Sequence, residues 1–358
     1  MSDLRASIRS LRTGVVPEWE LRRLSVAYEE FSHQLTALLE PLAQSGECAP
    51  LFVRGEWGTG KTHLLSYLKT MATSQGFAHV TVTLNPRSAA LNYPQRFYPL
   101  MSETVTFAGV RGLRSILRMA LQDREIRRAI QAFAETPAAQ PIGAALRVIC
   151  AQYKLSEGSD FGDEAAWDIL LGADLAWSSA KRLKAFARIA SFTTLLKIVG
   201  AHGTVAVFDE AESVDQLFNR LSRTGAYETL AALCCQVGTL CVFGITRRFE
   251  ACINKDIANL SLFAHSKLAA AFLEGWRAAR FRTVEPPKIS ASDASKLVEL
   301  VTQTYLEAYP DASTHGDVAE SALKQWNANA ARNPRRLVRL IIDALDSQRP
   351  LSPWAASA

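Results

Sequence analysis

A glycine-rich segment, GEWGTGKT at 55–62, carries residue types that bind phosphate. Gly55, Gly58 and Gly60 let the backbone curl so that its N–H groups point inward at phosphate oxygens. Lys61 can then reach the β- and γ-phosphates, and the Thr62 hydroxyl is suited to ligating Mg²⁺. We expect the nucleotide-binding residues to be Gly55, Gly58, Thr59, Gly60, Lys61, Thr62 and His63, with His63 either a structural residue or a phosphate neighbour.

The second segment whose residue types could do chemistry is GTVAVFDEAE at 203–212, an apolar run followed by acidic residues. TVAVF is typical of a buried strand in a parallel sheet, and ligands bind beyond the carboxyl ends of such strands. There Asp209 could hold the Mg²⁺ shell while Glu210 polarises an attacking water. The alternative is an acidic first turn of a helix. Glu212 is expected to be solvated.

A third apolar run, TLCVFG at 239–244, leads to Thr246. If this strand lies next to the acidic strand, the Thr246 hydroxyl could hydrogen-bond the γ-phosphate or the water. An ordinary helix N-cap is an equally good interpretation of this threonine.

The hydrophobic pattern in the rest of the chain predicts the strands and helices that must position these residues. LFV at 51–53 and HVTVTL at 79–84 predict strands, and HLLSYLKTMAT has helical spacing. The stretch of about 120 residues before the acidic strand is longer than a crossover needs. We predict a helical insertion over about 110–190, with a loop at Leu155–Gly172.

The C-terminal part predicts a small helical section. Pro286 and Pro287 end the core, and SASDASKLVELV then begins a helix with a Ser/Asp cap. A last amphipathic helix, LVRLIIDAL, starts after ARNPRR at 331–336. Arg335 and Arg336 therefore lie at the start of that helix, and a basic surface turn is the alternative reading of these two residues.

The order of these strands, with helices between them and a helical tail, resembles the AAA+ ATPases, particularly the origin-recognition and Cdc6-like branch. The resemblance implies that Thr246 and Arg335 (or Arg336) sense the γ-phosphate and close a lid. It also implies an arginine supplied by a neighbouring subunit. Candidates for that arginine are Arg247, Arg248, Arg277, Arg280 and Arg282.

The N-terminal segment suggests a closer family. The leader residues Arg12, Gly14 and Pro17, and the RGxxGxGKTHxL pattern around the glycine-rich segment, resemble the P-loop ATP-binding proteins of BREX-type phage-exclusion systems. The DEAE sequence at 209–212 agrees. This resemblance implies a role in phage defence.

An arginine-rich stretch offers a candidate nucleic-acid surface. Arg111, Arg114 and Arg118 recur at i, i+3 and i+7, which would place them on one helix face. Such a stripe can neutralise backbone phosphates. A solvated helix face or an intersubunit salt-bridge surface is the alternative.

Composition is consistent with a folded chain and excludes several classes. The 358 residues contain 48% hydrophobic and 21% charged residues, with a formal net charge of +5. No apolar run is long enough to span a membrane, and no secretory signal is present. We expect a cytoplasmic protein without membrane contact. The six cysteines are expected to be free thiols, and the histidines show no metal-binding spacing.

We predict an α/β fold with a parallel-sheet P-loop (AAA+) core, a long helical insertion and a small C-terminal helical lid. The expected domains are a helical leader over 1–45, the ATPase core over 46–283 and the lid over 284–358. The expected function is Mg²⁺-dependent ATP hydrolysis, carried by Glu210, Lys61, Thr246 and Arg335. It would act as a switch or motor in a homo-oligomer or a complex with DNA-modification or defence proteins, with DNA as a possible partner. The alternatives are a non-hydrolysing ATP-binding scaffold that assembles partners on DNA and a small-molecule kinase.

Overall fold

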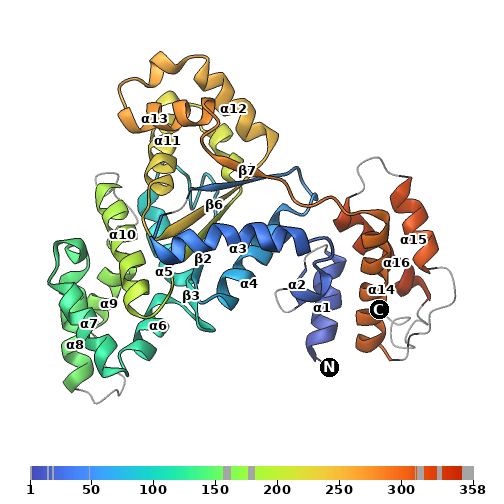
Figure 1. The fold of residues 1–358 in the computed structure, drawn as a ribbon, viewed down its shortest axis with the longest axis horizontal. Coiled ribbons are helices and arrows are strands. Elements are labelled where there is room, and N and C mark those ends of the chain that lie inside the picture. Colours follow the sequence, from blue (N-terminus) through green and yellow to red (C-terminus); the bar gives the residue numbers. More distant parts are fainter. Residues whose placement is uncertain are drawn as a thin grey trace, which may run out of the picture. The chain divides into compact units, whose positions relative to one another are not determined.

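The computed structural model describes the chain except residues 1, 14–15, 18–19, 48, 156–162, 176–181, 311, 313–317, 329–332 and 349–358. The described chain has a mixed α/β fold with a mostly parallel seven-stranded sheet (Figure 1). It divides into two compact units. Unit 1 consists of Met1–Leu35, Gly55–Thr70 and Glu285–Ala358, and unit 2 consists of Thr36–Arg54 and Met71–Val284. None of the described helices combines the length and the apolar character that crossing a bilayer requires.

The sheet lies in unit 2 and has the strand order β4-β3-β2-β5-β6-β1-β7. The strands are β1 (Leu51–Arg54), β2 (Ala78–Thr83), β3 (Thr106–Phe107), β4 (Val110–Arg111), β5 (Thr204–Asp209), β6 (Thr239–Ile245) and β7 (Arg282–Val284). From β2 to β7 every neighbouring pair is parallel, whereas β3 and β4 pair in antiparallel fashion. The four strands expected from the sequence are therefore present.

Continuous apolar sequence explains the centre of the sheet. All seven residues of β6 are buried, as are the first five of β5, so both faces of these strands are covered. Phe243 of β6 stacks on Phe208 of β5 and on Phe52 of β1, with ring centroids 5.2 and 5.1 Å apart. This aromatic row lies on residues that are paired in register across the three strands, and its contacts favour that register.

A tight hairpin forms one edge of the sheet. Ala108 and Gly109 connect β3 to β4 with φ values of +48° and +79°, and two positive φ values are characteristic of a two-residue hairpin turn. Gly109 supplies one of these values without steric cost. Of this hairpin only β4 falls within the helical insertion predicted to begin at about residue 110, and neither of its strands was predicted.

Helices occupy most of the predicted insertion (Figure 1). They are α6 (Leu113–Ala120), α7 (Arg124–Ala134), α8 (Gly143–Leu155), α9 (Glu164–Leu171) and α10 (Arg182–Ile198), preceded by α5 (Phe97–Thr104).

The loop predicted over Leu155–Gly172 is wrong for its second half, because α9 begins after an N-cap at Asp163 and ends at the left-handed Gly172. A Cβ at Gly172 would lie 2.5 Å from the Tyr98 ring, so only glycine fits this close approach. Residues 156–162 lie outside the described chain.

The remaining helices of unit 2 follow the two central strands. They are α11 (Arg220–Cys234), α12 (Arg247–Ile257) and α13 (Lys267–Arg277), and α13 packs against both α11 and α12. The helix α3 (Glu29–Gln44) contributes its second half to this unit.

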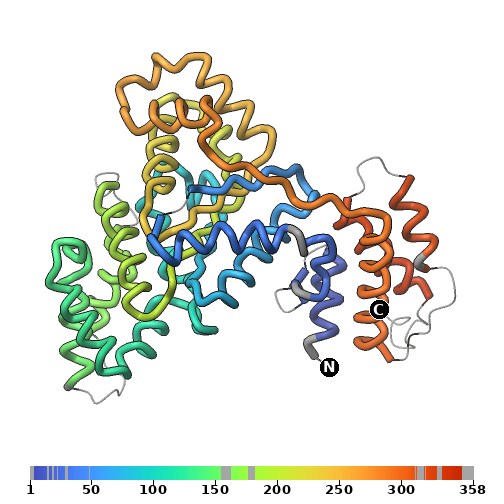
Figure 2. Tube along the Cα trace, viewed as in Figure 1, coloured from blue at the N-terminus to red at the C-terminus, as the bar shows by residue number. Residues whose placement is uncertain are grey.

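Unit 1 combines segments from both ends of the chain (Figure 2). Its helices are α1 (Ser2–Arg12), α2 (Leu21–Leu24), α14 (Ala291–Ala308), α15 (Val318–Asn327), α16 (Pro334–Gln348) and most of α4 (Lys61–Ser74). Ile8 and Leu11 of α1 share a buried apolar core with Tyr305 of α14 and Ile341 of α16. The predicted Ser/Asp cap of α14 is confirmed, since Ser290 and Asp293 cap each other's backbone N–H groups.

Candidate functional site

The glycine loop, defined here as Gly55–Gly60, connects β1 to α4. Gly58 and Gly60 have φ values of +82° and +98°, which L-residues with side chains rarely adopt. The Thr59 hydroxyl donates to the Glu56 carbonyl oxygen at 2.8 Å and closes the turn. A Cβ on Gly55 would lie 2.5 Å from that hydroxyl oxygen, so a side chain at this position would displace the hydroxyl from the turn.

The first turn of α4 follows this loop directly. Lys61 is the first helical residue and is buried, whereas the next residue, Thr62, is exposed. The first N–H groups of a helix lack partners within the helix, and the helix dipole adds partial positive charge at this end. This turn contains no acidic residue. Loop and helix together therefore form a positively polarised backbone cradle suited to an anion.

Two segments from the C-terminal part of unit 1 lie against the glycine loop. Pro286 would contact a Cβ on Gly55 at 3.5 Å and one on Gly60 at 3.7 Å. A Cβ on Gly58 would overlap the side-chain amide of Asn333. Asn333 thus approaches the loop backbone too closely for a side chain at position 58, whereas Pro286 lies at ordinary van der Waals distance from positions 55 and 60.

Asn333 is held in place at the start of α16. Its Oδ1 accepts the backbone N–H of Arg335 at 2.9 Å, and its carbonyl oxygen accepts the indole N–H of the buried Trp326 at 3.1 Å. The predicted Arg335 lies in the first turn of this helix and is half-buried, whereas Arg336 is exposed. Asn333 was not among the predicted site residues. The signal was available, because Asn is a favoured N-cap and Pro334 a favoured first helical residue.

His63 points toward the N-terminal segment. Its Nε2 lies 2.8 Å from the Ser25 hydroxyl, and its ring meets the Tyr28 ring edge-on at 5.1 Å. Burial lowers the pKa of His63 from 6.5 to about 4, so the ring is neutral at physiological pH. Of the two interpretations of His63, these contacts favour the structural one.

The acidic tip, defined as Asp209 and Glu210, follows the buried strand β5 in unit 2. Glu210 has φ +61° and ψ +38°, a left-handed conformation that costs a non-glycine residue about 1–2 kcal/mol. Its N–H donates to Asp209 Oδ1 at 2.9 Å. Strained residues of this kind cluster at functional sites, so the conformation favours a functional role over an ordinary helical turn. A 3₁₀ turn, Ala211–Gln216, follows.

Glu212 differs from its prediction. It was expected to be solvated, but it is half-buried and its Oε2 is inaccessible. The reason is the 3₁₀ turn, which packs against α12 and β6 instead of continuing into solvent as a helical first turn would.

Thr246 follows the carboxyl end of β6 and is 2% exposed. Its hydroxyl is buried and has no hydrogen-bond partner among the residues that the structure describes. It occupies the N-cap position of α12, yet its side chain does not cap the helix. The N-cap interpretation therefore does not account for this hydroxyl. A buried hydroxyl without a partner costs free energy, which is recovered when a ligand or water bonds to it.

Sheet topology relates the carboxyl ends of three strands. Phe208 pairs with Phe243 across β5 and β6, and Arg54 pairs with Ile245 across β1 and β6. Asp209, Thr246 and the residue that leads into the glycine loop therefore end neighbouring parallel strands. In open α/β sheets, ligands bind beyond such ends.

Residues 2–152 match the family model described as BREX system ATP-binding protein BrxC/D. The matched segment is less than half of the 358-residue chain. It includes the glycine loop and ends before the acidic tip and Thr246. The match supports the similarity to BREX ATP-binding proteins expected from the leader and the loop. In the leader, Arg12 pairs with Asp346 at 2.6 Å and Gly14 lies outside the described residues. No curated protein matches the chain.

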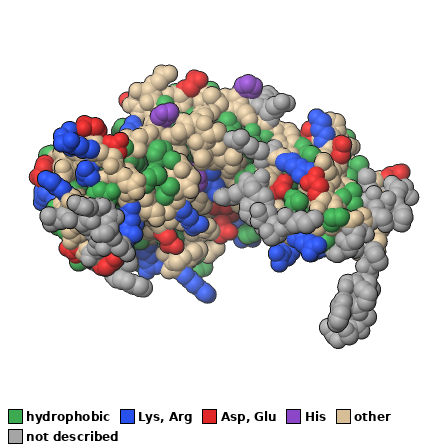
Figure 3. Space-filling model, turned by 90° about the horizontal axis from the view of Figure 1, so that it is seen from below, with side chains coloured by type: hydrophobic (Ala, Val, Ile, Leu, Met, Phe, Trp, Pro, Cys, Tyr) green, Lys and Arg blue, Asp and Glu red, His purple; other side chains and the backbone are tan. Residues whose placement is uncertain are grey.

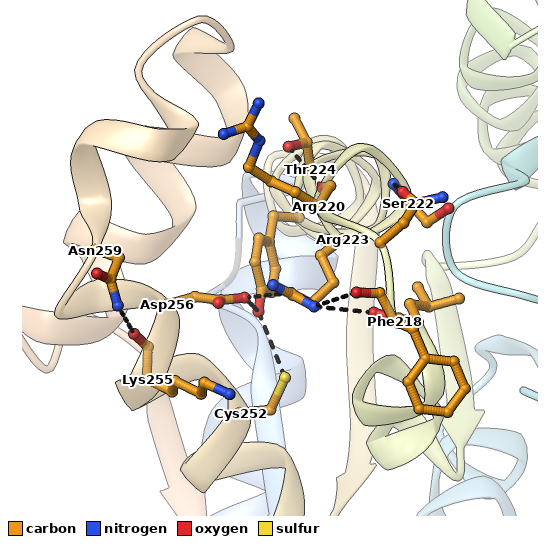
Figure 4. A network of polar contacts seen from close by, with 12 residues as sticks. Phe218, Arg220, Ser222, Arg223, Thr224, Cys252, Lys255, Asp256 and Asn259 are labelled. Atoms are coloured by element: carbon orange, nitrogen blue, oxygen red, sulfur yellow. Dashed lines mark hydrogen bonds and ion pairs between the residues drawn. The ribbon is translucent and has the colours of Figure 1, made fainter.

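A buried polar network fixes the backbone between the 3₁₀ turn and α11 (Figure 4). Arg223 donates through Nε to Asp256 at 2.8 Å and through Nη1 to the carbonyl oxygens of Leu217 and Phe218 at 3.1 Å. Tyr227 also donates to Asp256 at 2.7 Å. The network was not predicted, because Arg223 and Tyr227 of α11 reach Asp256 of α12 only in the folded chain.

The predicted arginine stripe is wrong in its geometry. Arg111 lies on β4, and α6 begins only at Leu113, so Arg111 shares no helix face with Arg114 and Arg118. Gly109 and Gly112 flank this strand, and a continuous helix through Arg111 would not require glycine at either position.

The two helical arginines of the predicted stripe are also engaged within the chain. Arg114 forms a bidentate ion pair with Glu164 and lies over the Trp167 ring. Arg118 is close enough to lower the pKa of Glu164 together with Arg114. Over α6–α9, basic side chains are interspersed with acidic ones (left in Figure 3). This stripe therefore does not offer a continuous surface for nucleic acid.

The five arginines considered for an intersubunit role are all exposed. They are Arg247 and Arg248 in the first turn of α12, Arg277 at the end of α13, Arg280 in the following turn and Arg282 in β7.

No group of three His, Cys, Asp or Glu residues that could hold a metal is found in the described part of the chain. Five cysteines are free thiols there, as expected, and Cys48 lies outside it.

Proposed function

We propose that this chain is a P-loop ATPase of the AAA+ type that acts in a BREX-like phage-defence system. The observation that carries the proposal is the glycine loop, whose positive-φ glycines precede the buried Lys61 at the start of α4. Strand, glycine loop and helix in this order form the context in which the GxxxxGKT pattern binds phosphates. The family match over 2–152 includes this segment and describes an ATP-binding protein.

The glycine loop would bind the triphosphate of ATP. Backbone N–H groups from Gly55 to Gly60 and the first turn of α4 would donate to the phosphate oxygens, and Lys61 would contact the β- and γ-phosphates. Thr62 and Asp209 would hold a Mg²⁺ ion, which offsets the charge of the phosphates. The donor set fits, because a hydroxyl and a carboxylate are oxygen ligands of the kind that Mg²⁺ prefers.

Glu210 would act as the general base. It accepts a proton from water while the water oxygen bonds to the γ-phosphorus and the bond from that phosphorus to the β,γ-bridging oxygen breaks, which yields ADP and inorganic phosphate. The Thr246 hydroxyl, buried and without a partner among the described residues, would bond the γ-phosphate or the water. Arg335 would contact the γ-phosphate from α16, so that the contacts of the helical section differ between ATP and ADP.

The cellular role follows from resemblance. The chain would serve as a switch or motor within a homo-oligomer or a complex with DNA-modification or other defence proteins in the cytoplasm. The similarity to BREX ATP-binding proteins supports this context. The AAA+ and Cdc6-like resemblance supports a lid that opens and closes with the nucleotide state.

ATP turnover by the purified full chain tests the proposal. We expect Glu210→Gln to lower kcat by about 10²–10⁴-fold while ATP binding is retained, because removal of a general base costs this much. Lys61→Ala should abolish binding. Glu212→Gln, a change of the same size two residues away, serves as the control and should retain turnover.

Two outcomes would overturn the proposal. Retention of turnover in Glu210→Gln would exclude this residue as the base. Tight ATP binding without turnover, in the presence and absence of DNA, would instead favour a nucleotide-dependent scaffold that assembles partner proteins.

A further inference from the structure

Three arginines lie within six residues at the end of unit 2. Arg277 ends α13, Arg280 lies in the turn and Arg282 is in the edge strand β7. All three are exposed. Within the described part of the chain, their guanidinium groups form no ion pair or hydrogen bond. Three free positive charges are thus concentrated on one short segment.

Other arginines of unit 2 are used within the fold. Arg188 pairs with Asp174, Arg223 with Asp256 and Arg114 with Glu164. Those pairs stabilise contacts between helices. The arginines at 277, 280 and 282 make no comparable contact with any residue that the structure describes, so the described fold does not explain their charge.

The segment that carries them is rigidly attached. Phe281, between Arg280 and Arg282, stacks on Phe272 at 5.2 Å and packs on Phe52 at 5.6 Å. A Cβ at Gly275 would lie 3.0 Å from the Phe281 ring, so α13 is closely approached by this ring.

The turn is the usual end of a helix. Ala279 adopts φ +51° after the C-cap of α13, the Arg280 N–H donates to the Gly275 carbonyl oxygen and the Ala279 N–H donates to the Trp276 carbonyl oxygen, both at 3.0 Å. These two bonds form a Schellman motif, which fixes the backbone between Arg277 and Arg280.

The surroundings indicate which partner would fit. Between Ala269 and Val284 no large hydrophobic side chain is exposed, and the half-exposed Leu268 lies at the opposite end of α13 from Arg277. Protein interfaces are centred on buried aromatic and aliphatic anchors, which this surface lacks. Single-stranded nucleic acid is bound by exposed aromatic rings that stack on bases, and Trp276 and Phe281 are instead packed into the aromatic core. Arginine without such rings suits phosphate oxygens, which the guanidinium group contacts bidentately.

We propose that Arg277, Arg280 and Arg282 bind the phosphate backbone of double-stranded nucleic acid without regard to base sequence. The inference is independent of the nucleotide site, because no residue of the glycine loop or acidic tip takes part in it.

Salt-dependent binding of a labelled duplex DNA to the full chain tests this surface, with the triple variant Arg277→Gln, Arg280→Gln, Arg282→Gln compared with the wild type. Each lost phosphate contact should reduce the slope of log K against log salt by about 0.9, so the slope should fall by about 2.7. The ratio of the DNA affinity of the wild type to that of the triple variant should therefore fall by about 40-fold between about 50 and about 200 mM salt.

The control removes the same charge elsewhere. Arg124, Arg128 and Arg147 are exposed on α7 and α8, and their triple change to glutamine should leave the slope near the wild-type value. Circular dichroism and thermal unfolding verify that both triple variants are folded.

Several results would overturn the inference. These are no duplex binding by the wild type, equal slopes for the wild type and the Arg277 triple variant, or equal losses in both triple variants. Equally tight binding of poly-L-glutamate would indicate an acidic protein partner. Unchanged DNA binding together with lost ATP turnover in the Arg277 triple variant would assign these arginines to catalysis between subunits.

Discussion

Breaking the Arg223–Asp256 pair should destabilise unit 2 more than any surface ion pair does. In Asp256→Ala, Arg223 keeps its bonds to the Leu217 and Phe218 carbonyl oxygens but loses its counter-charge. The Asp256 side chain is only 7% exposed and that of Arg223 22%, so water replaces the lost partner poorly.

The expected magnitude follows from that burial. Removing one partner of a buried ion pair costs about 3–5 kcal/mol, and the partial exposure of Arg223 places this pair near 3 kcal/mol. Tyr227 also loses its acceptor, which adds about 1 kcal/mol. We therefore expect the free energy of unfolding to fall by about 4 kcal/mol.

Urea denaturation of the full chain, followed by circular dichroism, measures this change. The matched control is Arg128→Ala, which breaks an exposed pair with Glu125 whose side chains are 57% and 78% exposed. That control should cost less than about 0.5 kcal/mol. A loss below about 1 kcal/mol in Asp256→Ala would refute the reasoning, because the network would then not hold the loop. A double-mutant cycle with Arg223→Met should give a coupling energy of about 2–3 kcal/mol.

Three further predictions concern Gly58, Thr246 and His63. Gly58→Ala should lower the free energy of unfolding by more than Gly109→Ala does and should weaken ATP binding at least tenfold. Both glycines have positive φ, but only Gly58 is closely approached by Asn333. Equal losses of stability in urea denaturation would contradict this close approach. Thr246→Val should lower kcat but leave the free energy of unfolding unchanged or raise it by about 1 kcal/mol. The reason is that it removes a buried hydroxyl that lacks a partner among the described residues. A large loss of stability would mean that the hydroxyl is bonded within the fold. Because the folded-state pKa of His63 is depressed to about 4, the unfolded chain binds the proton first, and the free energy of unfolding without nucleotide should fall by about 2–3 kcal/mol as the pH is lowered from 6.5 to 4. A His63→Gln variant that keeps the same pH dependence would contradict this assignment.

The sequence predicted features whose signal is local. The glycine loop, the strands β5 and β6 and the cap of α14 each depend on residues within a short window. The helix α9 was missed because Gly158 and Gly162 suggested a loop, although Asp163 followed by EAAWDILL is a capped amphipathic pattern.

Features that depend on distant partners could not be predicted in this way. Asn333 meets Gly58 across 275 residues of sequence, and Arg223 of α11 meets Asp256 of α12 only in the folded chain. The arginines at 277, 280 and 282 could be recognised as lacking partners among the described residues only after the partners of the other arginines were known. The sequence shows which residue types are present and how they are spaced, whereas packing decides which of their side chains remain free to bind a partner.

The position of β1 between β6 and β7 limits when this protein can fold. Both hydrogen-bonding neighbours of β1 come from beyond residue 238, whereas the glycine loop begins at residue 55. On the ribosome, the strand that leads into this loop therefore gains its second neighbour only after Val284 has been synthesised and released from the exit tunnel. Until then β1 is an apolar segment with unpaired edges, which is the kind of intermediate that chaperones bind. A fragment limited to residues 2–152 would remain in that state permanently, because it contains neither neighbouring strand.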